Sequence, residues 1–137
     1  MPLFIRQEPG SEPATPSLRL AAPRVLVVED EMTVAALIED MVSGLDCEVT
    51  AMVGRLEDAM RLAESGSFDL AILDIHLNGK TVFPFAAELD RLEIPYLFAT
   101  AYGVREIPAA FRGHPMVQKP FGPLELRRAL MTLGAGF

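Results

Sequence analysis

Apolar and polar positions follow a block pattern along this chain, in which short apolar runs alternate with longer amphipathic stretches. A short apolar run bounded by turn residues is typical of a strand that is buried on both faces of a sheet. The run from Leu70 to Leu73 is the clearest case, because it ends in Asp74 and is soon followed by the turn pair Asn78-Gly79. Five segments fit this description: residues 24–28, 47–53, 70–74, 96–100 and 116–119.

The stretches between these runs carry apolar residues at the three- and four-residue spacing of a helix. This spacing predicts four helices: residues 33–45, 55–64 and 82–92, and a last one from Pro123 onward. We expect their apolar residues to be mostly buried, including Leu37 in the first helix, Met60 in the second and Leu124 in the last.

The link between the fourth and fifth strands, residues 101–115, breaks this regular alternation. It contains Gly103, Pro108, Gly113 and Pro115, which interrupt helical hydrogen bonding. At best a turn or two of helix fits, starting near Pro108, where a proline at a first helical position is tolerated.

Strands that alternate with helices through short links favour a parallel sheet covered by helices on both faces, a doubly wound α/β domain. Residues 1–22 differ from the rest, because they hold four prolines and few residues that could be buried. The sequence therefore predicts a flexible N-terminal tail over residues 1–22 and one folded domain over residues 23–137.

Composition narrows the class of protein. A length of 137 residues suits one domain, and a formal net charge of −7 argues against binding nucleic acid, which needs clustered Lys and Arg. The single cysteine, Cys47, has no partner for an internal disulfide, which suits a reducing compartment. The sequence shows neither an apolar run long enough to cross a membrane nor a secretory leader, so we expect a cytoplasmic protein.

Polar side chains stand at the carboxyl ends of four predicted strands. Glu29-Asp30-Glu31 follows the first strand, and Asp74 ends the third. Thr100 ends the fourth strand and Lys119 the fifth. Because right-handed crossovers bring all carboxyl ends of a parallel sheet to one edge, we expect these groups to meet there.

The chemistry of these groups is complementary. Clustered carboxylates repel one another unless a cation lies among them, and oxygen-only ligands favour Mg²⁺. Lys119 supplies a positive charge and Thr100 a hydroxyl donor, both suited to a phosphoryl oxygen. A carboxylate beside a metal can also act as a nucleophile and form an acyl phosphate.

Four segments in this order resemble the receiver domain of two-component response regulators: Val28-Glu29-Asp30-Glu31, Leu73-Asp74, Ala99-Thr100-Ala101 and Lys119-Pro120-Phe121. The resemblance covers residue 23 to the C-terminus. It implies a flavodoxin-like five-stranded parallel sheet of order 2-1-3-4-5. It also implies a phosphoacceptor signalling domain rather than an enzyme, with at most slow self-phosphorylation and autodephosphorylation.

The resemblance assigns a role to each of the residues at the carboxyl edge of the sheet, which is called the rim below. Asp74 matches the phosphorylated aspartate, and Asp30 and Asp74 match direct Mg²⁺ ligands. Glu29 matches a residue that acts on the metal through water. His76, two residues after Asp74, matches the position whose backbone carbonyl binds the metal.

The remaining matches concern the response to phosphorylation. Thr100 matches the switch hydroxyl, and Lys119 matches the lysine that pairs with the phosphoryl group. The peptide bond between Lys119 and Pro120 is cis in the family.

The segment Phe98-Ala99-Thr100-Ala101-Tyr102 is similar to a Phe-Ala-Thr-Gly-aromatic motif that marks a subfamily of receivers with a shortened or irregular fourth helix. This chain has Ala101 where that motif has Gly. Two interpretations of Tyr102 stay open: a mobile aromatic side chain that reports the state of Thr100, or a side chain that merely covers the core.

The resemblance implies that the partners are a sensor histidine kinase and a downstream protein target or phosphorelay partner, and it leaves a homodimer open. The readout face would be the side formed by the fifth strand, by residues 101–115 in the place of the family's fourth helix, and by the last helix, which begins at Pro123. A phosphate sink without an effector is one alternative, and a receiver-like domain that only binds partners is another. A Mg²⁺-dependent hydrolase with an aspartate nucleophile is disfavoured, because it needs a second aspartate where His76 stands.

Overall fold

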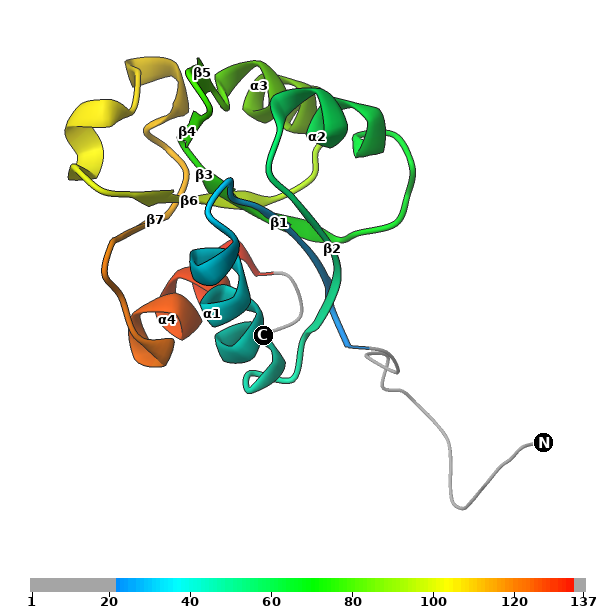
Figure 1. Cartoon of the computed structure of the whole chain (residues 1–137), viewed down its shortest axis with the longest axis vertical. Helices are drawn as coiled ribbons and strands as arrows, with labels where there is room; N and C mark the ends of the chain where they lie inside the picture. The colour runs from blue at the N-terminus through cyan, green and yellow to red at the C-terminus, as the bar shows by residue number, and fades with distance from the viewer. Residues whose placement is uncertain (1–21, 135–137) are drawn as a thin grey trace.

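The computed structural model describes residues 22–134, and five parallel strands form its central sheet. These strands are β1 (Arg24–Val28), β2 (Glu48–Val53), β3 (Leu70–Asp74), β6 (Tyr96–Thr100) and β7 (Met116–Gln118). Their order in the sheet is β2-β1-β3-β6-β7, which confirms the predicted order 2-1-3-4-5 (Figure 1). The predicted tail, residues 1–22, lies almost entirely outside the described range.

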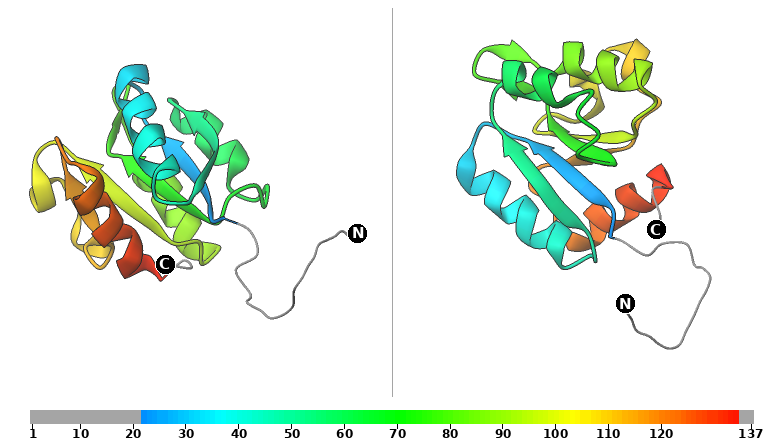
Figure 2. Two further views of the ribbon diagram at one scale, coloured as in Figure 1. Left: turned by 90° about the horizontal axis from the view of Figure 1, so that it is seen from below. Right: turned by 90° about the vertical axis from the view of Figure 1, so that its right-hand side faces the viewer.

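Two helices cover each face of the sheet. The helices α1 (Met32–Ser43) and α4 (Pro123–Leu133) pack on one face, and α2 (Leu56–Leu62) and α3 (Phe83–Arg91) pack on the other (Figures 1 and 2). This is the doubly wound α/β architecture that the alternation of strands and helices predicts. No helix among the described residues is both long and apolar enough to span a membrane.

Packing on both faces of the sheet explains why the apolar run of the central strand β3 is continuous. Ala71 and Leu73 pack in the core beneath α2 and α3, whereas Leu70 and Ile72 pack in the core beneath α1 and α4. Successive side chains of a strand point to opposite faces, so a strand that is covered on both sides needs apolar residues at every position.

A small hairpin follows β3 that the apolar pattern did not indicate. Its two strands, β4 (His76–Leu77) and β5 (Lys80–Thr81), are antiparallel and flank the pair Asn78-Gly79. Both turn residues have positive φ, +51° for Asn78 and +83° for Gly79, as a tight hairpin turn requires. The sequence predicted turn chemistry at this pair, and the structure adds the two short strands.

The link between β6 and β7 is irregular, as expected. It contains two short 3₁₀ turns, η1 (Gly103–Glu106) and η2 (Ala109–Phe111), in place of a full helix. The second turn begins next to Pro108, where helix was expected, and the first begins earlier. Gly103 is buried with φ of +78°, a conformation that a side chain would disfavour.

Aromatic side chains fix the position of this link against the body of the domain. The ring of Phe111 stacks on Phe83 with centroids 5.3 Å apart, and the ring of His114 stacks on Tyr96 at 3.9 Å. The Nε2 atom of His114 also lies 3.0 Å from Oδ1 of Asp90, on α3. The link is therefore packed against the rest of the domain, although its only helical segments are two short 3₁₀ turns.

Three of the apolar residues that we expected to be buried are instead exposed. Leu37 is 58% exposed, Met60 39% and Leu124 55%. In α1 the buried residues are Ala35, Ile38 and Val42, so the buried face is centred beside Leu37 rather than on it. Helical spacing defines a broad apolar face, and only the packing against the sheet decides how the helix is rotated.

Ile38 and Leu37 give a matched pair for testing this rotation. Ile38→Ala should lower the free energy of unfolding by roughly 2–5 kcal/mol, because it leaves a cavity under α1, where Ile38 is 2% exposed. Leu37→Ala should change it by no more than about 0.5 kcal/mol, as substitutions at exposed positions usually do. Urea denaturation of both variants checks this, and equal losses would contradict the rotation of α1 described above.

Candidate functional site

Three carboxylates gather at the carboxyl edge of the sheet. Glu29 and Asp30 follow β1, and Asp74 ends β3; the two strands are neighbours, with Val28 paired to Leu73. One oxygen of each carboxylate lies within 4.8 Å of the others. Glu29 is only 2% exposed, and Asp30 and Asp74 are half-buried, so the cluster is largely withdrawn from water.

Lys119 reaches this cluster from the edge strand of the sheet. It directly follows β7, and its backbone N–H donates to the carbonyl of Thr100 at 2.8 Å. Its Nζ donates to Oε1 of Glu29 at 2.7 Å and to Oδ1 of Asp74 at 3.2 Å. One ammonium thus joins two carboxylates that come from different strands.

The electrostatics of the cluster leave it short of positive charge. Burial and the negative charge of Glu29 raise the pKa of Asp74 to about 6, although Lys119 acts in the opposite direction. Burial also lowers the pKa of an ammonium, but the carboxylates of Glu29 and Asp74 outweigh it and raise the pKa of Lys119 above its ordinary value. A further cation would relieve this imbalance.

The donor set fits a magnesium ion. It consists of oxygen ligands at close range, and Mg²⁺ binds proteins through one or two carboxylates together with waters. Asp30 is held in place from the hairpin, because its Oδ2 accepts a hydrogen bond from the backbone N–H of Asn78 at 3.0 Å. Oε2 of Glu29 accepts from the backbone N–H of Glu31 at 3.1 Å.

Thr100 lies at the same edge, one residue beyond the Asp74–Ala99 pairing of β3 and β6. Its side chain is fully buried, and its hydroxyl donates to Oε1 of Glu106 and lies 3.4 Å from the carbonyl of Gly103. Oε2 of Glu106 lies 2.7 Å from Nε2 of His76.

Sequence reasoning missed Glu106. It sits in η1, inside the link whose conformation the sequence left undefined, and its only sequence signal is an acid in a short apolar-rich stretch. The structure makes its side chain just 10% exposed and places it between residues that follow β3 and β6. The imidazole of His76 is 63% exposed and contacts Glu106 through Nε2.

Tyr102 and Pro120 complete the predicted set. The side chain of Tyr102 is 64% exposed, so the interpretation that it covers the core is wrong for this structure. Its backbone N–H donates to the hydroxyl oxygen of Thr100 at 3.2 Å. The peptide bond between Lys119 and Pro120 is cis.

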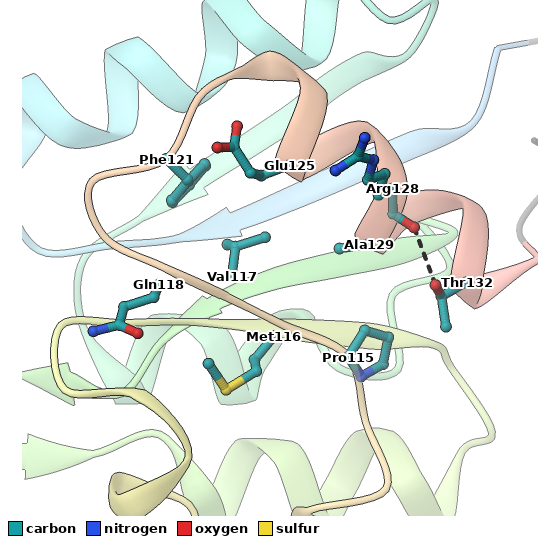
Figure 3. A pocket seen from close by; sticks show the side chains of 9 residues that line it. All are labelled: Pro115, Met116, Val117, Gln118, Phe121, Glu125, Arg128, Ala129 and Thr132. Carbon is teal, nitrogen blue, oxygen red and sulfur yellow. Dashed lines mark hydrogen bonds between the residues drawn. The ribbon is translucent and has the colours of Figure 1, made fainter.

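A separate groove lies beside the edge strand, between β7 and α4 (Figure 3). Its volume is about 520 Å³, and apolar side chains such as Met116 and Phe121 line it together with Glu125 and Arg128. None of the cluster carboxylates lines this groove.

Comparisons with known proteins agree with this geometry. Residues 25–131 match the sequence model of the family described as "Response regulator receiver domain". A search of curated proteins found no match.

Among solved structures, SdrG from Sphingomonas melonis Fr1 is 34% identical with a TM-score of 0.74, over 82% of this chain and 96% of that one. A structure of the BeF3-activated conformation of SdrG, from Pseudomonas melonis Fr1, is also 34% identical, with a TM-score of 0.71 over 83% of this chain and 98% of that one. The receiver domain of sensor histidine kinase PA1611 from Pseudomonas aeruginosa PAO1 is 25% identical, with a TM-score of 0.70 over 85% of this chain and 100% of that one. That structure has a magnesium ion coordinated in the active site cleft.

The family match spans well over half of the chain, and the sheet order agrees with it. Proteins of this family are phosphoacceptor signalling modules rather than catalytic enzymes. The acidic cluster at the carboxyl edge is the feature that such a module needs in order to hold a cation. This chain belongs to the response regulator receiver domain family.

Proposed function

We propose that this chain is a response regulator receiver that accepts a phosphoryl group on Asp74 from a sensor histidine kinase. The observation that carries the proposal is the contact between Lys119 and two carboxylates, Glu29 and Asp74, beside Asp30. Asp74 ends the central strand, and its half-buried carboxylate is bordered by the groups that phosphoryl transfer requires.

In the proposed step, an oxygen of the Asp74 carboxylate attacks the phosphorus of a phosphohistidine on the kinase. The phosphorus–nitrogen bond breaks, the electron pair returns to the imidazole, and Asp74 becomes an acyl phosphate. Lys119 compensates the negative charge on the phosphoryl oxygens. Because Lys119 already contacts Asp74, it needs no large movement to do so.

Mg²⁺ would be held by Asp30, Asp74 and the backbone carbonyl of His76, with Glu29 acting through a water molecule. When bound, it supplies charge compensation for the transferred group. The magnesium ion in the related PA1611 receiver supports this assignment. Buried Glu29 keeps Lys119 beside Asp74 and adds to the negative charge that attracts the metal.

The output of the receiver follows from Thr100. A phosphoryl group on Asp74 adds anionic oxygens, and the hydroxyl of Thr100 would shift toward them and move the segment around Tyr102. The readout face would include the link with η1 and η2, β7 and α4, which is the side that carries the groove of Figure 3. A cytoplasmic location, a tail over residues 1–22 and a receiver over residues 23–137 complete the proposal.

The phosphoacceptor is tested by Asp74→Asn, which keeps the shape of the side chain but removes the nucleophilic oxygen. Wild type incubated with a small acyl phosphate and Mg²⁺ should gain the mass of one phosphoryl group, measured by mass spectrometry of the intact protein. Asp74→Asn should gain none and keep the wild-type circular dichroism spectrum. Asp40→Asn, at an exposed site on α1, is the control and should be phosphorylated like wild type. Phosphorylation of Asp74→Asn at the wild-type rate would refute the assignment.

The raised pKa of Asp74 predicts how the stability of the protein changes with pH when no divalent metal is present. The folded pKa of about 6 lies above the ordinary value of 3.8, so the folded state binds this proton more tightly than the unfolded state does. The stability contributed by this proton is present below about pH 4 and is lost as pH rises through about 6. The loss is at most roughly 3 kcal/mol, at about 1.4 kcal/mol for each pKa unit.

Urea denaturation in EDTA at several pH values measures this loss as the difference between wild type and Asp74→Asn. The difference should grow from pH 4 to about 6.5, with wild type becoming relatively less stable. Excess Mg²⁺ above pH 6 should stabilise wild type and leave Asp74→Asn little changed, because the metal binds the ionised carboxylate. A difference that is flat with pH would argue against a protonated Asp74 in the metal-free fold.

A further inference from the structure

Glu106 is a nearly buried acid that the proposed phosphoryl transfer does not use. Its two carboxylate oxygens contact different parts of the rim: Oε1 accepts from the hydroxyl of Thr100, and Oε2 lies 2.7 Å from Nε2 of His76. Oε1 also lies 3.4 Å from the backbone N–H of Tyr102, which donates to it. Glu106 therefore connects the residues that follow β3, the end of β6 and the start of the irregular link.

We propose that Glu106 is a latch that holds the receiver in its unphosphorylated conformation by competing with phosphorylated Asp74 for the hydroxyl of Thr100. The inference rests on the function proposed above and adds a residue to it. Glu106 is a positioning residue in this scheme, because it acts on Thr100 and not on the phosphoryl group.

The competition follows from the chemistry of a hydroxyl group. Thr100 has a single O–H proton, so it can donate strongly to one acceptor at a time. In this structure that acceptor is the Glu106 carboxylate. A phosphoryl oxygen on Asp74 can take the proton only after the contact with Glu106 has broken.

The charge of Glu106 strengthens this competition. Its carboxylate oxygens contact the hydroxyl of Thr100 and the imidazole of His76. Hydrogen bonds to a charged acceptor such as a carboxylate are stronger than neutral ones. A newly formed phosphoryl group would face a second anion at the same rim, which favours displacement of η1.

The contacts of Tyr102 suggest how the displacement is transmitted. Its backbone N–H lies 3.2 Å from the hydroxyl oxygen of Thr100 as well as near Glu106, whereas its ring is exposed. When Thr100 exchanges Glu106 for a phosphoryl oxygen, the backbone of Tyr102 loses one of its two acceptors. The position of the exposed ring then depends on which acceptor the hydroxyl of Thr100 donates to.

The test uses Glu106→Gln, which keeps the size of the side chain but removes its charge. The probe is beryllofluoride with Mg²⁺, titrated while the backbone amide shifts of Thr100 and Tyr102 are followed by NMR. Removing the latch should lower the half-saturating beryllofluoride concentration about fivefold or more, within the usual range for coupling of two sites. Without the probe, the Glu106→Gln shifts should lie part of the way toward those of saturated wild type.

Arg105→Gln is the matched control, because Arg105 is the exposed neighbour of Glu106 in η1. It should titrate like wild type. General damage to the fold would raise the half-saturating concentration of Glu106→Gln rather than lower it, so the direction of the change separates a latch from a structural role.

The outcomes distinguish this inference from the proposed function. If wild type responds to beryllofluoride and Glu106→Gln has the same or a higher half-saturating concentration, the latch is overturned and the receiver function stands. If wild type with Mg²⁺ does not respond at all, both are overturned.

Discussion

The ammonium of Lys119, placed between the carboxylates of Glu29 and Asp74, is the interaction on which the site depends. Buried carboxylates of like charge destabilise a fold unless a cation compensates them. Lys119 provides this compensation from the opposite side of the rim, because β7 lies two strands away from β3 in the sheet. The contacts form because the carboxyl ends of β1, β3 and β7 lie at the same edge of the sheet. The chemistry of the site therefore depends on the topology of the sheet.

The compensation is incomplete, because Lys119 contacts only two of the three carboxylates and the cluster keeps an excess of negative charge. One lysine faces the three carboxylates of the cluster, and burial together with the negative charge of Glu29 raises the pKa of Asp74. A divalent cation bound among these carboxylates would add positive charge next to the residue that we propose as phosphoacceptor. The same excess of negative charge would therefore favour the binding of a cation at this edge of the sheet.

The response side of the rim uses a second, smaller set of polar contacts. Thr100 is buried and hydrogen-bonded to Glu106, whose other oxygen contacts His76. The link that carries Glu106 has two 3₁₀ turns in place of a helix, but Phe111 and His114 pack its distal part against the domain. Its first turn carries the polar contacts of Glu106, which we propose that a phosphoryl group on Asp74 displaces.

The apolar pattern predicted the strands and the rim of Glu29, Asp30, Asp74, Thr100 and Lys119, because runs buried on both faces must be apolar and parallel strands share one carboxyl edge. The sheet order followed only from the resemblance to the receiver family. The sequence also located the irregular link from its glycines and prolines. The tertiary structure alone decided how the helices are rotated, so that Leu37 is exposed beside buried Ile38. It also decided that Glu106 contacts both Thr100 and His76. Those contacts join residues across an irregular segment, for which neither spacing nor periodicity constrains where a side chain points.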